Sequence, residues 1–167
     1  YYAFEESDSC DRQGSCNEGR AFTIHIVDNF KKEVMRIKRP FACCSCCIRC
    51  EDPNNLSHAL TVEAPPGRLI GSIGQQKAWC SPEFYVKDMN DKVQLKIGSN
   101  ICSPVFNVQT LEGQVIGNIT RYSQGLMTDL FSDADTFGMS VPMDLDIKTK
   151  ATLIGATFLI DFMFYER

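Results

Sequence analysis

The chain has 167 residues and a formal net charge of −4. This length suits one sizeable domain and is short for two, so we take residues 1–167 as a single domain. The acidic balance excludes a surface that is basic overall, and we expect no nucleic acid as a partner. The chain opens at Tyr1 and Tyr2 with no initiator Met and no signal-peptide pattern, so we expect an upstream region.

Alternating apolar and polar residues predict a run of β-strands over about residues 20–145. In "FTIHIVD", Phe22, Ile24 and Ile26 share one face. The alternation breaks at "DN", and "EVMRIKR" resumes it with Val34 and Ile37 as the apolar positions. Together the two stretches predict an antiparallel hairpin.

The same pattern recurs in "FYVKDMNDKVQLKIG" and "FNVQTLEGQVIGNIT", with turns at Asn90-Asp91 and Glu112-Gly113. The stretches "GRLIGSI" (67–73) and "GQVIGNI" (113–119) also match each other, with a glycine inside each strand. Such a glycine is typical of a bend or of close approach by another segment. Repeated hairpins of this length predict a mainly β protein whose antiparallel sheet closes into a barrel or folds into a sandwich.

Five of the nine cysteines lie within the stretch "CCSCCIRC", from Cys43 to Cys50. An odd number of cysteines, with pairs adjacent in sequence, is unfavourable for a secreted disulfide scaffold, so we expect a reducing compartment. Three roles are open for the cluster: lipid attachment, metal binding, or plain buried cysteines.

Lipid attachment is the first hypothesis. An acyl chain contributes about 0.8 kcal/mol per buried CH₂, and stable anchoring needs a second signal. That signal is present just upstream, because "KKEVMRIKR" carries five basic residues and one Glu, and each basic residue adds about 1 kcal/mol near an anionic leaflet. The predicted acyl sites are Cys43, Cys44, Cys46, Cys47 and Cys50, and the predicted membrane-facing basic residues are Lys31, Lys32, Arg36, Lys38 and Arg39.

Zinc is the alternative ligand of the cluster, because Cys43 with Cys46 and Cys47 with Cys50 both have the C-x-x-C spacing. Four thiolates this close in sequence would have to fold tightly round one ion, whereas zinc ribbons keep their two pairs far apart. A second pair would then come from Cys10, Cys16, Cys80 or Cys102.

The acidic stretch "DADTFGMSVPMD" (133–144) has the length of a calcium-binding loop. Asp133, Asp135 and Asp144 fall at positions 1, 3 and 12 of the twelve-residue pattern. Position 5 lacks an acidic side chain, so backbone carbonyls would have to complete the site, and we expect weak affinity. The candidate ligands are Asp133, Asp135, Phe137, Met139, Val141 and Asp144. The alternative is an acidic turn before a helix.

The residues from Ala151 to Phe164 are nearly all apolar, and only Asp161 among them is charged. We predict a helix over about residues 147–165. The run is shorter than the roughly 18–20 residues that a spanning helix needs. Two placements are open: a helix buried on all sides by the sheet, or a short membrane span that extends back to Leu145.

Nothing in the sequence indicates covalent catalysis. His25 and His58 have no neighbouring Ser or Cys in a catalytic pattern. A phosphate-cradling Gly-x-x-x-x-Gly-Lys loop is also absent from the sequence.

Four stretches, "RPFACCSCCIRC", "APPGRLIG", "SDADTFGMSVPMDLDIKTKA" and "IGATFLIDFMFYER", resemble the phospholipid scramblase family. The resemblance runs along essentially the whole chain. It implies a tubby-like fold, in which a closed antiparallel β-barrel of about twelve strands surrounds a buried C-terminal hydrophobic helix. It also implies palmitoylation at the cysteine cluster and a calcium-binding segment before the helix. The cysteine motif departs from its fullest family form, because Ile48-Arg49 stands where Cys-Pro is usual.

The resemblance implies a calcium-responsive, ATP-independent phospholipid scramblase that moves phospholipids between membrane leaflets. Its cofactor would be weakly bound Ca²⁺, and its partners would be membrane phospholipids; protein partners and an oligomer are left open. Lipidation, the C-terminal helix, or both would hold it on the cytoplasmic face of the plasma membrane or an internal membrane. The alternative function is a lipid-anchored tubby-like module that recognises anionic phospholipids or proteins without transporting lipid.

Overall fold

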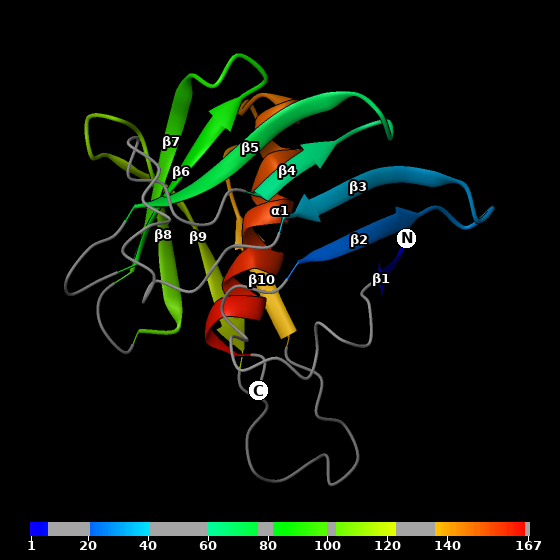
Figure 1. Cartoon of the computed structure of the whole chain (residues 1–167). Helices are drawn as coiled ribbons and strands as arrows, with labels where there is room; N and C mark the ends of the chain where they lie inside the picture. Colours follow the sequence, from blue (N-terminus) through cyan, green and yellow to red (C-terminus); the bar gives the residue numbers. More distant parts are fainter. Residues whose placement is uncertain (7–20, 41–59, 77–81, 100–102, 123–135, 166–167) are drawn as a thin grey trace, which may run out of the picture.

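The computed structural model of the chain describes residues 1–6, 21–40, 60–76, 82–99, 103–122 and 136–165. In these ranges the chain forms ten β-strands and one α-helix (Figure 1). The strands are β1 (Tyr2–Glu6), β2 (Phe22–Val27), β3 (Glu33–Arg39), β4 (Leu60–Glu63), β5 (Leu69–Gln76), β6 (Glu83–Asp88), β7 (Val93–Gly98), β8 (Val105–Gln109), β9 (Val115–Tyr122) and β10 (Thr136–Ser140), and the helix is α1 (Ile147–Phe164).

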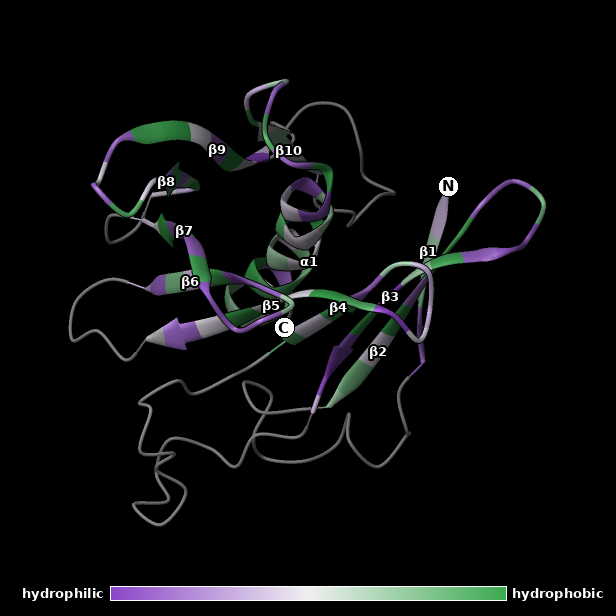
Figure 2. Ribbon diagram, turned by 90° about the horizontal axis from the view of Figure 1, so that it is seen from above, coloured by the Kyte–Doolittle hydropathy of each residue, from purple (hydrophilic) through white to green (hydrophobic). Residues whose placement is uncertain are grey.

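All ten described strands belong to one antiparallel sheet, in which each strand pairs with its neighbours in sequence from β1 to β10. The strands lie in an arc around α1 (Figure 2). The mainly β fold and the C-terminal helix predicted from the sequence are therefore present. Among the described residues β1 and β10 are the two edges and the sheet is not closed, so the closed barrel of about twelve strands is not shown. β1 also lies before residue 20, where the strands were predicted to begin.

The core lies between the concave face of the sheet and α1. Strand residues such as Ile37, Val62 and Phe84 are fully buried there, and so are Leu153 and Leu159 of the helix. The helix contacts β4, β5 and β6. Of the two placements left open by the sequence, the structure has the helix packed against the sheet.

Gly155 explains why the helix can lie so close to the sheet. A Cβ atom at this position would come within 2.7 Å of Val62 Cγ2 and 3.1 Å of Leu60 Cδ2. At its N-terminus the helix is capped by Asp146, whose carboxylate accepts hydrogen bonds from the backbone N–H groups of Lys148 and Thr149, each at 3.0 Å. Near its C-terminus, Phe162 stacks on Phe22 of β2 with ring centroids 4.2 Å apart.

The two matching glycine-containing stretches serve close approach, as predicted. A Cβ atom at Gly71 would collide with the Thr152 side chain of α1, and one at Gly117 would collide with the Ser140 carbonyl of β10. Each strand with such a glycine therefore admits another segment against its backbone.

One sequence prediction about β3 is wrong. Ile37 is buried as expected, but its inward-facing neighbour is Met35, which packs against the core. The register pairs Ile24 with Ile37 and Ile26 with Met35, and it shifts at Val27. Val34 therefore lies on the opposite face from Ile37, because side chains alternate along a strand.

Candidate functional site

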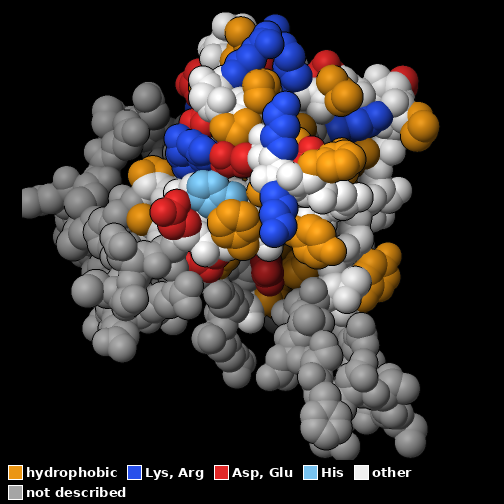
Figure 3. All heavy atoms as spheres, turned by 90° about the vertical axis from the view of Figure 1, so that its right-hand side faces the viewer, with side chains coloured by type: hydrophobic (Ala, Val, Ile, Leu, Met, Phe, Trp, Pro, Cys, Tyr) orange, Lys and Arg blue, Asp and Glu red, His pale blue; other side chains and the backbone are white. Residues whose placement is uncertain are grey.

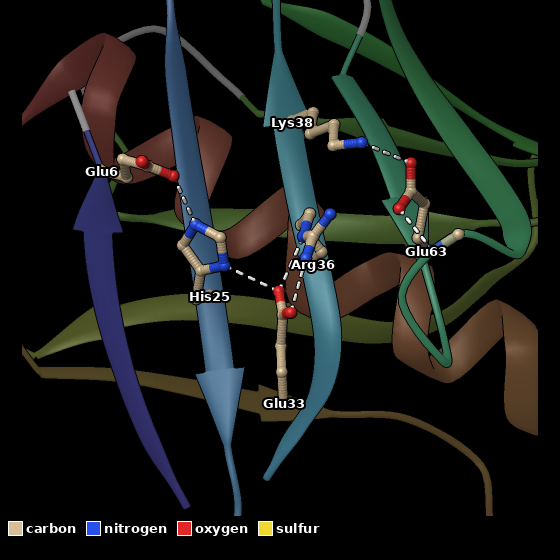
Figure 4. A network of polar contacts seen from close by, with 7 residues as sticks. Glu6, His25, Glu33, Arg36, Lys38 and Glu63 are labelled. Carbon is tan, nitrogen blue, oxygen red and sulfur yellow. Dashed lines mark hydrogen bonds and ion pairs between the residues drawn. The ribbon is translucent and has the colours of Figure 1, made fainter. Parts of the chain in front are cut away.

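A network of charged side chains crosses the outer face of β1, β2 and β3 (Figure 4). His25 of β2 lies at its centre, with Nδ1 2.7 Å from Glu33 Oε1 and Nε2 2.9 Å from Glu6 Oε2. Both ring nitrogens therefore face a carboxylate oxygen. Phe4 of β1 stacks on the imidazole, with centroids 5.1 Å apart. The network joins the edge strand β1 to the rest of the sheet.

Glu33 connects His25 to Arg36. The guanidinium of Arg36 donates from Nε at 2.7 Å and from Nη2 at 2.5 Å, a bidentate pair. The hydrogen bond from Arg36 lowers the pKa of Glu33 from its ordinary value of 4.5 to about 2, and the contact with His25 acts in the same direction. The same carboxylate raises the pKa of Arg36.

The five basic residues predicted to face a membrane do not share one surface. Arg39 is buried, with 2% of its surface exposed, and its guanidinium lies over the ring of Phe22 at 5.8 Å. Arg36 is paired with Glu33, and Lys38 Nζ lies 2.8 Å from Glu63 Oε1. Lys31 and Lys32 are exposed in the turn between β2 and β3. Within the described residues, these two lysines are therefore the members of the set best placed to meet an anionic surface.

Lowering the pH should test the Glu33 pair. A carboxyl whose pKa is lowered on folding stabilises the fold fully above its unfolded pKa of about 4.5, and this stabilisation is lost as the pH falls toward 2. We expect Glu33→Gln to lower the free energy of unfolding by about 1 kcal/mol at neutral pH and to flatten its decline between those two pH values. Urea unfolding of both proteins across this range is the measurement. Asp91→Asn, which removes an exposed pair with Lys87, is the control; an equal effect of both substitutions would contradict the prediction.

The predicted calcium segment is only partly described, because Asp133 and Asp135 lie outside the described residues. Phe137 and Met139 belong to β10, which pairs with β9, and their side chains pack against the core. A five-residue strand extends roughly 13 Å from its first to its last Cα, so residues 136–140 do not fit the compact loop that the sequence pattern suggested. Calcium binding by the segment stays a prediction.

The segment after β10 leads directly into α1. Val141 packs against the core, whereas Asp144 is exposed. Lys150 Nζ donates to the Met143 carbonyl at 2.5 Å, which ties this segment to the first turn of the helix. A change in the acidic segment would therefore act on the start of α1.

A pocket of about 320 Å³ lies between the start of α1 and the hairpin of β6 and β7. Its polar lining includes Lys87 and Asp88 from the sheet and Asp146 and Lys148 from the helix end. Asp88 is already engaged: its Oδ1 accepts from the backbone N–H groups of Asn90 and Lys92, which together with the side chain of Gln94 keep the pKa of Asp88 low. The pocket is a small recess in which charges of both signs lie beside apolar side chains such as Ile70 and Val86.

The cysteine cluster, Cys43 to Cys50, lies outside the described residues. Within the described ranges, no three side chains of His, Cys, Asp or Glu gather closely enough to hold a metal ion. The acylation and zinc hypotheses both stay predictions.

The profile of the Scramblase family matches residues 1–167. The chain belongs to this family. It is 39% identical to human phospholipid scramblase 1 over 99% of the chain and 52% of that protein. It is 38% identical to bovine phospholipid scramblase 2, over 99% of the chain and 57% of the relative, and 38% identical to human phospholipid scramblase family member 5, over 99% and 62%. No solved structure matches significantly. The chain spans about half the length of the curated relatives that it matches.

Family membership is what the sequence resemblance predicted. Nothing helical in the described part of the chain combines the length and the hydropathy needed to cross a bilayer.

The sequence analysis did not identify the His25 network of this scramblase-family domain. The contact between His25 and Glu6 has no local pattern, because Glu6 is 19 positions away in the sequence. The register of β1 on β2 places Glu6 beside Thr23, so its carboxylate can reach the imidazole. Only the β-favouring Tyr2 and Phe4 of "YAFEE" indicate a strand there.

Proposed function

We propose that the chain moves phospholipids between the two leaflets of a membrane, without ATP and in response to calcium. The observation that carries the proposal is the match to the Scramblase family along the whole chain, with relatives named phospholipid scramblases at about 38% identity. Lipid movement between leaflets makes and breaks no covalent bond, so it needs no nucleophile or general base. A polar path for the headgroup is sufficient.

Membrane attachment is the second part of the proposal. Acyl chains on Cys43, Cys44, Cys46, Cys47 and Cys50 would hold the domain on the cytoplasmic face, and Lys31 and Lys32 would add electrostatic attraction to anionic lipid. Two kinds of contact together satisfy the two-signal requirement for stable anchoring.

A lipid-anchored binding module is the other candidate function. It is favoured by the burial of α1, whose residues Leu153, Leu159 and Ile160 have no exposed surface. A helix whose side chains are buried in the core of the domain cannot at the same time line a path for lipid headgroups through the hydrocarbon layer of the membrane. Transport would then depend on more than one copy of the chain or on local thinning of the bilayer.

A leaflet-exchange assay separates the two functions. The purified chain is incorporated into liposomes that contain a fluorescent phospholipid, and the loss of fluorescence to a membrane-impermeant quencher is followed with calcium or with a chelator. We expect calcium to accelerate exchange over protein-free liposomes. Vesicle binding without any acceleration would favour the binding module.

The calcium response has its own arm in this assay. Asp133→Ala and Asp144→Ala should remove the calcium-dependent part of the exchange, whereas Glu112→Gln, at an exposed turn far from the acidic segment in sequence, should not. Calorimetric titration should show affinity of roughly 10⁻⁴–10⁻³ M in the wild type. Equal heats in the wild type and both Asp variants would contradict calcium binding by the segment and favour the alternative of an acidic turn.

A further inference from the structure

The turn between β2 and β3 presents a phenylalanine to solvent. Phe30 has 91% of its surface exposed. Lys31 and Lys32 follow it and are also exposed. Tyr2 lies at the same corner, because it pairs with Val27 at the end of β2, and it is 71% exposed. Aromatic and basic side chains are therefore exposed to solvent together at this corner. Figure 3 views the molecule from the side on which the β2–β3 hairpin projects in Figure 1, and hydrophobic and basic side chains are interspersed there.

The geometry of the turn does not require a phenylalanine. Four hairpin turns of the described chain share one arrangement, in which the N–H of the first residue donates to the carbonyl of the fifth at 2.9 Å. The fourth residue has a positive φ of 63° or 88° in each. The turns are 28–32, 64–68, 88–92 and 110–114. Their third residues are Phe30, Pro66, Asn90 and Glu112. Any of several residue types is thus compatible with the place that Phe30 takes.

The turn of residues 88–92 is a close twin of the turn of residues 28–32. Asp28 Oδ1 accepts from the N–H groups of Phe30 at 2.8 Å and Lys32 at 2.9 Å. Asp88 Oδ1 accepts from the equivalent N–H groups at 2.8 and 3.0 Å, with asparagine at the place of Phe30. The hydrogen bonds of the turn therefore do not need the exposed ring, which leaves it available for a contact outside the fold.

We propose that this corner is a membrane-contacting tip, with the ring of Phe30 inserted among the acyl chains just below the headgroups of an anionic leaflet. Lys31 and Lys32 would lie at the phosphate level, and the ring of Tyr2 would lie at the interface, where tyrosine is enriched. The inference rests on the proposed membrane function and adds a specific contact that is independent of the cysteine cluster.

The charges around the tip favour anionic lipid. Neither Lys31 nor Lys32 has an ion pair among the described residues, so both charges are available. The carboxylate of Asp28 is occupied by the backbone N–H groups of the turn, and Glu33 is occupied by Arg36 and His25. The two acidic groups nearest in sequence therefore do not compete for the lysines.

The shape of the tip favours a bilayer over a protein. A stable protein interface buries about 800 Å² on each partner, which requires a broad and fairly flat surface. A five-residue turn at the end of a hairpin offers one projecting ring with charges behind it. A single exposed ring with basic side chains beside it can enter the headgroup region of a bilayer.

Vesicle binding tests the tip directly. The whole chain, produced without acylation, is sedimented with phosphatidylcholine vesicles that contain or lack phosphatidylserine. We expect Phe30→Asn, which copies the twin turn, to weaken binding to the anionic vesicles roughly tenfold. Lys31→Gln with Lys32→Gln should remove the preference for phosphatidylserine. The thermal midpoint of both variants should equal that of the wild type, because the turn hydrogen bonds are unchanged.

The matched control is Leu111→Asn, which removes an exposed apolar side chain, 46% accessible, from a turn of the same geometry without adjacent lysines. Its vesicle binding should be that of the wild type. Equal binding of Phe30→Asn and the wild type, or no binding of the wild type to anionic vesicles, would overturn the proposal.

Insertion has a spectroscopic test of its own. In a Trp79→Phe background, Phe30→Trp places the chain's single tryptophan at the tip. Anionic vesicles should shift its emission to the blue, and lipids brominated near the headgroup should quench it. Unquenched emission in bound protein would exclude insertion. This test does not depend on lipid movement between leaflets. If the bromolipids quench the tryptophan but the leaflet-exchange assay shows no exchange, the scramblase proposal is wrong and the proposal of a membrane-contacting tip stands.

Discussion

Replacing Leu159 with Ala should lower the free energy of unfolding by about 2–5 kcal/mol. The side chain has no exposed surface, and it belongs to the cluster in which α1 packs against the sheet. Truncation removes apolar contacts and leaves a cavity, because the surrounding strands cannot collapse around a smaller residue. Guanidinium unfolding of the detergent-free chain, followed by circular dichroism, measures the loss.

Ile154 supplies the control on the same helix. It is 37% exposed, so Ile154→Ala removes a side chain that is partly in solvent already. We expect its cost to be well below that of Leu159→Ala. Similar small losses for both variants, or a chain that folds only in detergent, would contradict the packing of the helix inside the sheet.

Replacing the cysteines at 43, 44, 46, 47 and 50 with Ala should move the protein from the membrane fraction of cells to the supernatant. Each acyl chain contributes about 0.8 kcal/mol per buried CH₂, so loss of several chains removes the dominant part of the membrane affinity. The tip at Phe30 and the two lysines would remain, and they supply only a reversible contact. Cell fractionation with acyl-exchange labelling is the measurement.

The control keeps the cluster and changes Cys80 and Cys102 to Ala. This variant should stay on membranes and keep its labelling. Tightly bound zinc in the wild type, found by elemental analysis together with no acyl labelling, would decide the cluster in favour of the metal hypothesis.

The hairpins were predictable from the sequence because their determinants are local. Alternation of apolar residues marks β2, β6 and β8, and the turns contain residues that tolerate positive φ, such as Asp91 and Gly113. The glycines at 71 and 117 were predictable as sites of close approach because glycine inside a strand has few other uses. Their partners on α1 and β10 were not, because they come from distant parts of the chain.

The helix was predictable because its apolar run is continuous. Its place against the sheet was one of two placements that the sequence left open, and the length of the run and Asp161 made the membrane span the less favourable one. Its depth in the core depends on Gly155, which the sequence analysis did not single out. Contact between this glycine and Val62 joins residues far apart in sequence.

The candidate site was less predictable because it depends on register. The basic stretch "KKEVMRIKR" suggested one charged surface, but alternation places Arg39 inward and Arg36 outward. Glu33 of the same strand pairs with Arg36, and Glu63 of β4 pairs with Lys38. Alternation from the buried Ile37 makes Met35, and not Val34, the other inward-facing apolar residue of the strand. The pairing of Lys38 with Glu63 joins two strands and has no local pattern in the sequence.

The position of α1 in the chain has a consequence for synthesis. The helix is made after every described strand, yet it packs against β4, β5 and β6 from the middle of the sheet. Until it leaves the ribosome, the inner faces of those strands have no partner and stay open to water. Incomplete sheets with exposed apolar faces are prone to aggregate. We therefore expect the nascent domain to depend on chaperones until its helix is complete.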